Sequence, residues 1–329
     1  MSETPGNQSE PAQQTPNSDI VNLPGSGRDV QEGVALLTPE QQVEQLSNFF
    51  EDNYPDIFRS LTTDEGREFT SQGKEVPAEL KEATERMWAK TPDLLAHSGL
   101  LVLGTGLDHS MPHVSYLRTG PAATPFGGAE LPEGVRATIL RPSEPNGAYA
   151  VSLHGGPGWF GDGQSHDQFW LPLFAALAER SGVTVIDVVY PLPGAGSWEP
   201  TQAAVAQTFN DVKNWVKQQR GSGSSQVGLI TFGTGFVAAR DVAGEADFHL
   251  IMTPRIPAGF AAAVESSRNY VSLAALDTRG TPADEVTAWM DGRGAEYKYS
   301  DYPSEHIIAA PSVWRGRVDE AAQWLAQQA

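Results

Sequence analysis

The stretch that decides the fold is Val227-Gly228-Leu229-Ile230-Thr231-Phe232-Gly233-Thr234-Gly235-Phe236-Val237-Ala238-Ala239. It predicts an apolar strand, a tight turn and a helix. Thr231, Gly233 and Gly235 occupy the fixed positions of the G-x-S-x-G turn, in which small outer residues permit a sharp bend and the middle serine presents its hydroxyl. Glycine stands at that middle position here, so the turn is retained and the nucleophilic oxygen is missing.

A shift of the motif by one residue does not restore a nucleophile. It would place Thr234 at the tip, but Phe232 and Phe236 would then occupy positions that require small residues. A residue at such a tip adopts a backbone conformation that costs about 1–3 kcal/mol, and glycine relieves much of that cost. Loss of the serine therefore favours the turn while it removes the atom that forms an acyl-enzyme.

A second motif, His154-Gly155-Gly156-Pro157-Gly158-Trp159, follows a predicted strand over 148–153. Glycines allow backbone N–H groups to approach a substrate oxygen and to stabilise developing negative charge. Pro157 has no N–H, so an oxyanion hole here relies on Gly155, Gly156 and the Thr234 N–H of the other turn. A glycine-rich turn without a catalytic role is the alternative interpretation.

An acid and a histidine follow in the chain order that accompanies the G-x-S-x-G turn. Asp277 comes after a predicted strand over 271–276, and His306 comes after one over 296–299. A carboxylate beside an imidazole fixes the tautomer and supports the protonated form. Taken singly, Asp277 is equally a turn or helix cap and His306 a solvated loop residue. Taken together, they favour a retained acid–base pair.

Strands and helices alternate from residue 135 onward. The apolar patterns predict strands over 135–140, 148–153, 183–189, 227–231, 249–252, 271–276 and 296–299. Between and after them they predict helices over 169–180, 201–219, 237–242, 284–291 and 318–328. This alternation is typical of an α/β fold, with a mostly parallel central sheet flanked by helices on both faces.

The N-terminal third is organised differently. Residues 1–33 are polar and lack the apolar surface that would offset chain entropy, so we expect a disordered tail. Thr38-Pro39-Glu40-Gln41 has the residues of a capping box at a helix start, and a second helix is predicted over 78–88. We therefore divide the chain into the tail, a helical cap region over 34–125 and an α/β domain over 126–329.

Composition excludes several classes of protein. The chain has 329 residues and a formal net charge of −19, which argues against binding to nucleic acid or to an anionic membrane surface. It contains no cysteine, which excludes disulfides and thiolate chemistry. No apolar run is long enough to span a bilayer, and the N-terminus lacks a signal-peptide pattern. We expect a cytoplasmic protein without a transmembrane segment.

Neither a metal nor a cofactor is expected. Only His109 and His113 have the i,i+4 spacing of a helical metal site, and with Asp108 they fit a loop of satisfied polar residues better. The run from Gly233 to Ala238 also matches G-x-G-x-x-A, a dinucleotide-binding pattern. That alternative is weak because the next predicted strand, 249–252, ends without the acid that would bind the ribose.

Four aromatic residues lie near the oxyanion motif, and they fit either the wall of an acyl pocket or ordinary core packing. We favour packing for most of them. They are Trp159, Phe160, Phe169 and Trp170.

Together these residues resemble the α/β-hydrolase superfamily over about residues 130–329, and the run from His154 to Trp215 is similar to the hormone-sensitive-lipase-like carboxylesterases. Four segments carry the latter resemblance: His154-Gly155-Gly156, Ser165-His166-Asp167, Leu177-Ala178-Glu179-Arg180-Ser181-Gly182 and Asp187-Val188-Val189-Tyr190-Pro191-Leu192. Pro157-Gly158 is closer to the proline iminopeptidases.

The resemblance implies an α/β-hydrolase fold with an N-terminal helical cap over the pocket. It also implies Gly155, Gly156 and Thr234 as oxyanion donors, Asp277 as the acid and His306 as the base, with Gly233 at the nucleophile position. Two functions follow as hypotheses. One is a degenerate esterase that binds an acyl, ester or lipid-like ligand, or a protein partner. The other is an enzyme that uses the His306–Asp277 dyad and the oxyanion hole without a serine.

Overall fold

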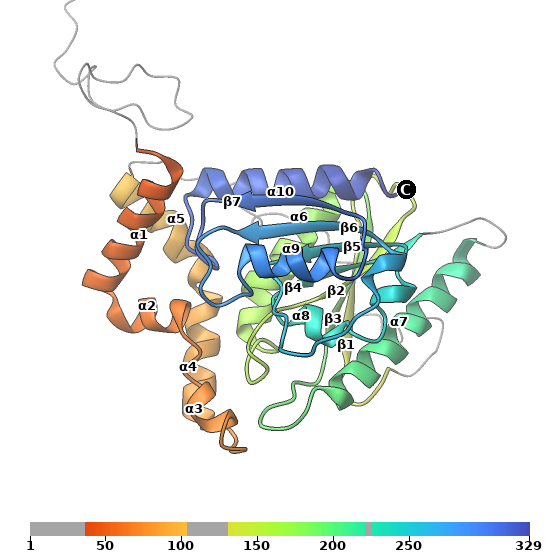
Figure 1. Cartoon of the computed structure of the whole chain (residues 1–329), viewed down its shortest axis with the longest axis horizontal. Helices are drawn as coiled ribbons and strands as arrows, with labels where there is room; N and C mark the ends of the chain where they lie inside the picture. The colour runs from red at the N-terminus through yellow and green to blue at the C-terminus, as the bar shows by residue number, and fades with distance from the viewer. Residues whose placement is uncertain (1–36, 104–130, 221–225) are drawn as a thin grey trace, which may run out of the picture.

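The computed structural model describes residues 37–103, 131–220 and 226–329. The predicted tail over 1–33 and the Asp108, His109 and His113 group lie outside the described residues. Figure 1 shows a group of N-terminal helices beside one end of a twisted sheet, with further helices packed on the sheet faces.

Five helices form the N-terminal segment: α1 (Pro39–Asn53), α2 (Pro55–Thr62), α3 (Arg67–Thr70), α4 (Ala78–Ala89) and α5 (Thr91–Leu103). The predicted capping box at the start of α1 is present. The Thr38 N–H donates to Gln41 Oε1 at 2.9 Å, and the Gln41 N–H donates to Thr38 Oγ1 at 3.3 Å. Helix α4 confirms the second predicted helix.

Seven strands form one sheet, in the order β1-β3-β2-β4-β5-β6-β7. They are β1 (Arg136–Leu140), β2 (Tyr149–Leu153), β3 (Thr184–Val189), β4 (Val227–Phe232), β5 (Phe248–Met252), β6 (Arg268–Ala274) and β7 (Tyr297–Tyr302). Only β1 is antiparallel to its neighbour, so the predicted mostly parallel sheet is confirmed. Because parallel strands need crossovers, helices separate them along the chain.

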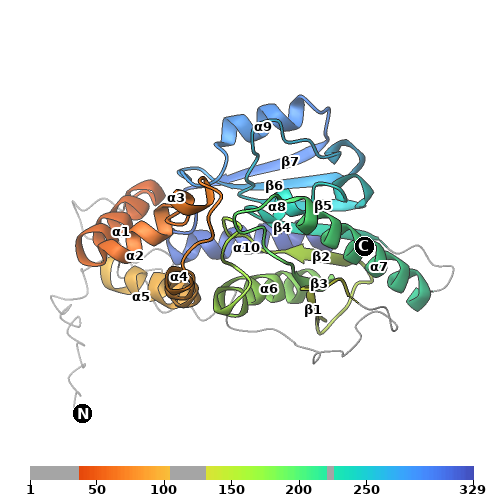
Figure 2. The same ribbon diagram turned by 90° about the horizontal axis from the view of Figure 1, so that it is seen from below.

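Helices cover both faces of the sheet (Figure 2). Helices α6 (Leu171–Ser181) and α10 (Pro311–Ala326) pack together on one face, while α7 (Glu199–Arg220), α8 (Gly235–Ala238) and α9 (Ala283–Asp291) lie on the other. Successive residues of β4 point to opposite faces of the sheet. Ile230 belongs to the apolar cluster that includes α6, and Leu229 belongs to the cluster that includes α7. A short π-helical turn, His166–Trp170, precedes α6.

Four predicted elements have wrong boundaries. The helix expected over 237–242 ends at Ala238, where the chain passes into turns and the buried Gln202 side chain on α7 donates to the Val237 carbonyl at 3.0 Å. The last helix begins at Pro311, seven residues before the predicted start, since proline suits a first helical turn. Strand β6 covers 268–274 instead of 271–276, and β7 covers 297–302 instead of 296–299.

The N-terminal helices share a core with the sheet domain. Leu46, Phe50, Leu61 and Trp88 are almost fully buried and belong to the same apolar cluster as Phe160 and the α6 and α10 side chains. Burying large apolar side chains stabilises by about 1.5–3 kcal/mol each. These helices are therefore attached to the sheet through a continuous core. The division at residue 125 stays a prediction.

Candidate active site

Gly233 lies where β4 turns into α8, and its φ is +56°, in the left-handed region that favours glycine. Its N–H donates to the Met252 carbonyl at 3.0 Å, which ties the turn to β5. A Cβ placed on Gly233 would have Gly155 Cα as its nearest neighbour, at 3.6 Å. The tip of the turn therefore has room for a side chain, at the cost of backbone strain.

The oxyanion motif packs directly against this turn. Gly156 has a φ of +110°, and a Cβ there would lie 2.3 Å from the Phe160 carbonyl oxygen, so only glycine fits. The Thr234 hydroxyl donates to the Gly156 carbonyl and joins the two turns. No described residue accepts a hydrogen bond from the N–H of Gly155, Gly156 or Thr234. Three donors are thus available beside Gly233.

Asp277 and His306 are brought together by the loops after β6 and β7. His306 Nδ1 lies 2.7 Å from Asp277 Oδ2, and the backbone N–H groups of Arg279 and Gly280 donate to Asp277 Oδ1 at 2.7 and 2.9 Å. Burial opposes ionisation of Asp277, but the His306 charge and these hydrogen bonds lower its pKa to about 2. The carboxylate is therefore ionised across the neutral range and holds one face of the imidazole.

A cavity of about 1010 Å³ joins the cap to this edge of the sheet. Gly156, Gly233, Thr234 and His306 all line it, whereas Gly155 and Asp277 lie behind them. Helices α2 to α4 and the loops beside them contribute the opposite wall, including Trp88. The sites predicted from separate motifs therefore meet in one space of a size that suits a small ligand.

The aromatic residues near the oxyanion motif divide between two roles. Phe160 and Trp170 line the cavity, and Trp170 stacks on Trp88 with ring centroids 5.8 Å apart. Trp159 and Phe169 are buried and pack against neighbouring rings outside the cavity lining. Ordinary packing therefore explains two of the four, and the other two give the cavity an apolar wall.

A residue that the motifs did not reveal fixes the oxyanion loop. Glu85 on α4 is 6% exposed, and its carboxylate accepts hydrogen bonds from the N–H groups of Gly161, Gly163 and Ser165 and from the Ser165 hydroxyl. These partners are 76 to 80 residues away in sequence. The cap helix thereby holds the loop that carries Gly155 and Gly156.

Arg279 makes a second connection, between the N-terminal helices and the loop that carries Asp277. Its Nη1 donates to the carbonyls of Ser60 and Leu61 at 3.2 and 2.9 Å, and its guanidinium lies 5.4 Å from the Trp88 ring centroid. Burial lowers the pKa of Arg279 to about 10, against the opposing charges of Asp64 and Asp277. The residue that flanks the Asp277 carboxylate is therefore also a link to α2.

Thr253, directly after β5, is the only non-glycine residue with a positive φ in the described part of the chain, at +38°. It is 2% exposed and lines the cavity, and its hydroxyl has no hydrogen-bond partner among the described residues. Such strain in a β-branched residue persists where the surrounding structure imposes it, and it is common at functional sites. No sequence pattern marked this position.

Behind the oxyanion loop lies a buried acid–base pair. His166 Nε2 is 2.9 Å from Asp187 Oδ2, and Ser152 donates to Asp187 Oδ1 at 2.9 Å. Burial opposes the charged imidazole, but the carboxylates of Asp187 and Asp167 raise the pKa of His166 to about 9. Burial and the neighbouring charge of His166 lower the pKa of His154 to about 3. The His154 ring stacks on the Tyr190 ring, with ring centroids 4.3 Å apart. His154 is thus neutral and structural.

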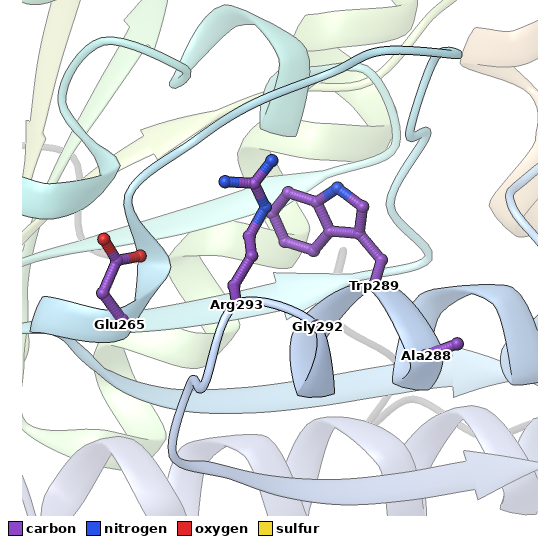
Figure 3. A pocket seen from close by; sticks show the side chains of 5 residues that line it. All are labelled: Glu265, Ala288, Trp289, Gly292 and Arg293. Carbon is purple, nitrogen blue, oxygen red and sulfur yellow. The ribbon is translucent and has the colours of Figure 1, made fainter.

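A shallower depression of about 420 Å³ lies beside α9 and contains none of the predicted site residues (Figure 3). Its main polar group, Arg293, donates to the carbonyls of Ala262 and Phe260 and lies 4.4 Å from the Trp289 ring centroid. The larger cavity is the candidate active site, because Gly233, Thr234 and His306 line it.

Within residues 37–103, 131–220 and 226–329, no three acidic or histidine side chains gather closely enough to hold a metal ion. No helix there combines the length and apolar character needed to cross a bilayer.

Solved structures resemble this chain, although its sequence matches no protein-family model and no curated protein. An arylesterase structure matches with a TM-score of 0.56 at 12% identity, over 90% of this chain and 100% of that chain. A mutant of an α/β-hydrolase from the metagenome of Lake Arreo, Spain, matches with a TM-score of 0.55 at 14% identity, over 89% and 98%. The monoclinic form of an esterase from Pyrobaculum calidifontis gives 0.50 at 14%, over 84% and 98%.

These likenesses at low identity concern the fold, and the observed sheet order and flanking helices agree with them. The chain has the α/β-hydrolase fold, as its motifs indicated.

Proposed function

We propose that the cavity binds an acyl, ester or lipid-like small molecule and that the chain forms no acyl-enzyme. The observation that carries the proposal is Gly233: the turn keeps its left-handed tip and the room for a side chain, but no nucleophilic atom is present. An acyl-enzyme needs such an atom. The rest of the site is suited to an acyl group.

The geometry supports a specific mode of binding. A ligand carbonyl oxygen would accept hydrogen bonds from the N–H groups of Gly156 and Thr234, which line the cavity and have no other described partner. The apolar part of the ligand would pack on Trp88, Phe160 and Trp170. The enclosure of the cavity between cap and sheet favours a small molecule over a protein partner, which would need a broad exposed surface.

The alternative function is ester hydrolysis by a water molecule, and the hydrogen bond between His306 and Asp277 supports it. In this hydrolysis His306 would take a proton from the water as the water oxygen bonds to the ester carbonyl carbon. The oxyanion donors would stabilise the tetrahedral intermediate, and His306 would then return the proton to the leaving alkoxide as the carbon–oxygen bond breaks. Asp277 would hold the imidazole tautomer and stabilise its charge.

The two functions are separated by hydrolysis of a panel of short- and long-chain acyl nitrophenyl esters, with His306→Ala as the comparison. The proposed function predicts that wild-type protein and His306→Ala release nitrophenol at the same low rate. Isothermal titration with matching fatty acids should then show binding to the wild-type protein. Hydrolysis that His306→Ala abolishes would establish the alternative instead.

A further inference from the structure

The cavity lining has a charge balance opposite to that of the whole chain. The protein contains 41 acidic and 22 basic residues. The ionisable side chains that line the cavity besides His306 are the arginines Arg67, Arg255 and Arg279 and the acids Asp64 and Glu285. An excess of positive charge in one cavity of an acidic protein concentrates anionic ligands there.

The backbone of Arg255 holds this residue beside the turn at Gly233. It follows β5, and its N–H donates to the Gly233 carbonyl at 3.1 Å. Its side chain extends to the Arg279 loop, where Nη1 donates to the Arg279 carbonyl at 3.4 Å. No carboxylate among the described residues lies within ion-pair distance of Arg255. The guanidinium is therefore held at the cavity wall without a counter-charge.

Arg279 is close enough to Arg255 for the two charges to repel, and this repulsion adds to the effect of burial in lowering the pKa of Arg279. Arg279 also has no ion pair among the described residues, and only its Nη1 has hydrogen-bond partners there. Bringing two guanidinium groups together costs free energy that a bound anion would offset.

The charges of Asp64 and Asp277 favour the charged form of Arg279, but neither carboxylate lies within ion-pair distance of its guanidinium. Asp64 accepts a hydrogen bond from Trp159 Nε1 at 2.8 Å, and Glu285 is exposed on α9. Asp277 is already held by His306 and by two backbone N–H groups. Arg67 on α3 adds a further cation at the cavity wall and has no side-chain partner among the described residues.

We propose that the ligand of this cavity is an acyl compound that carries a carboxylate, and that Arg255 and Arg279 bind that carboxylate. A guanidinium matches the planar carboxylate through paired N–H donors. Because three arginines face two acids, the surplus of one positive charge fits a monoanion better than a doubly charged phosphate group. The inference rests on the proposed function, since it names the ligand class for the same cavity.

The test compares two ligands that have the same shape and differ in charge: monomethyl glutarate and its neutral amide, methyl glutaramate. Isothermal titration of the wild-type full-length protein should give a dissociation constant at least about 10-fold lower for the acid than for the amide. Arg255→Gln should remove this preference by lowering the affinity for the acid to about that for the amide. Arg141→Gln, an exposed change outside the cavity lining, should behave as wild type.

The outcomes separate this inference from the proposed function. Equal binding of acid and amide to the wild-type protein would overturn the carboxylate inference and leave the acyl-binding function standing. A preference for the acid that survives in Arg255→Gln would overturn the assignment of the carboxylate to Arg255 and Arg279. Absence of binding by both compounds and by every acyl ligand of the panel would refute the proposed function and this inference together.

Discussion

His306 Nδ1 lies 2.7 Å from Asp277 Oδ2, and the turn between β4 and α8 has glycine, Gly233, at its tip. His306, Gly156 and Thr234 line one cavity around Gly233, and the function we propose treats His306 as the base and the two backbone N–H groups as oxyanion donors. A histidine held by an ionised carboxylate at a cavity wall is poised for proton transfer. Restoring the missing oxygen is therefore the direct way to ask what the arrangement can do.

Asp277→Asn should impair any hydrolysis that depends on His306. In a protein that also carries Gly233→Ser, we expect kcat for nitrophenyl butyrate to fall by about 10³-fold or more, because an amide cannot stabilise the imidazolium or fix the tautomer. KM should change little. Asp284→Asn, an exposed substitution on α9, is the matched control, and a loss of less than about 10-fold for Asp277→Asn would contradict the assigned role.

Glu85→Ala should destabilise the protein strongly. The change leaves three backbone N–H groups and the Ser165 hydroxyl without their acceptor in a buried place, and we expect the free energy of unfolding to fall by about 3–5 kcal/mol. Chemical denaturation measures it. Glu79→Ala on the exposed face of the same helix should stay within about 0.5 kcal/mol of wild type. Similar values for the two variants would show that Glu85 does not hold the loop.

The His166–Asp187 pair predicts a pH-dependent stability. The pKa of His166 is about 9 in the folded state, above the ordinary histidine value of about 6.5. The stability that the pair contributes is therefore fully present below about pH 6.5 and is lost as the pH rises through about 9. Urea unfolding at intervals from pH 6 to 9.5 should show a steeper decline for wild type than for His166→Gln. Parallel curves would contradict the raised pKa.

Thr253→Val should stabilise the protein without ligand. The substitution keeps the β-branched shape and removes a buried hydroxyl that has no partner among the described residues, so the free energy of unfolding should rise by about 1 kcal/mol. Thermal unfolding followed by circular dichroism provides the measurement. A destabilised Thr253→Val protein would indicate that the hydroxyl is satisfied in solution.

The elements of the fold were predictable because their signals are local. Apolar runs bounded by glycine and polar residues marked all seven strands, and Thr38 and Gln41 marked the start of α1. The end of α8 was not predictable from its own residues, and its last turn is contacted by the Gln202 side chain of another helix. Tertiary contacts of this kind override the preference of a short segment.

The residues of the candidate site that come directly after strands were predictable from the sequence. Gly233, Asp277 and His306 each come directly after a strand or in its loop, and parallel strands bring such loops to one edge. Glu85 and Arg279 were not predictable, because an isolated acid or arginine in sequence carries no sign of the distant backbone groups that it binds. The strained Thr253 also followed an ordinary strand pattern.

The measurement that tests the account most directly is nitrophenyl ester hydrolysis by Gly233→Ser beside Gly233→Ala. Both variants add a Cβ to a left-handed residue and should lose about 1 kcal/mol of stability, so they differ only in the hydroxyl. The account predicts turnover by Gly233→Ser at least about 10²-fold above Gly233→Ala and wild type, with a burst from the acyl-enzyme. Folded Gly233→Ser protein that binds acyl ligands yet hydrolyses no ester would contradict an intact oxyanion hole and acid–base pair around a vacant nucleophile position.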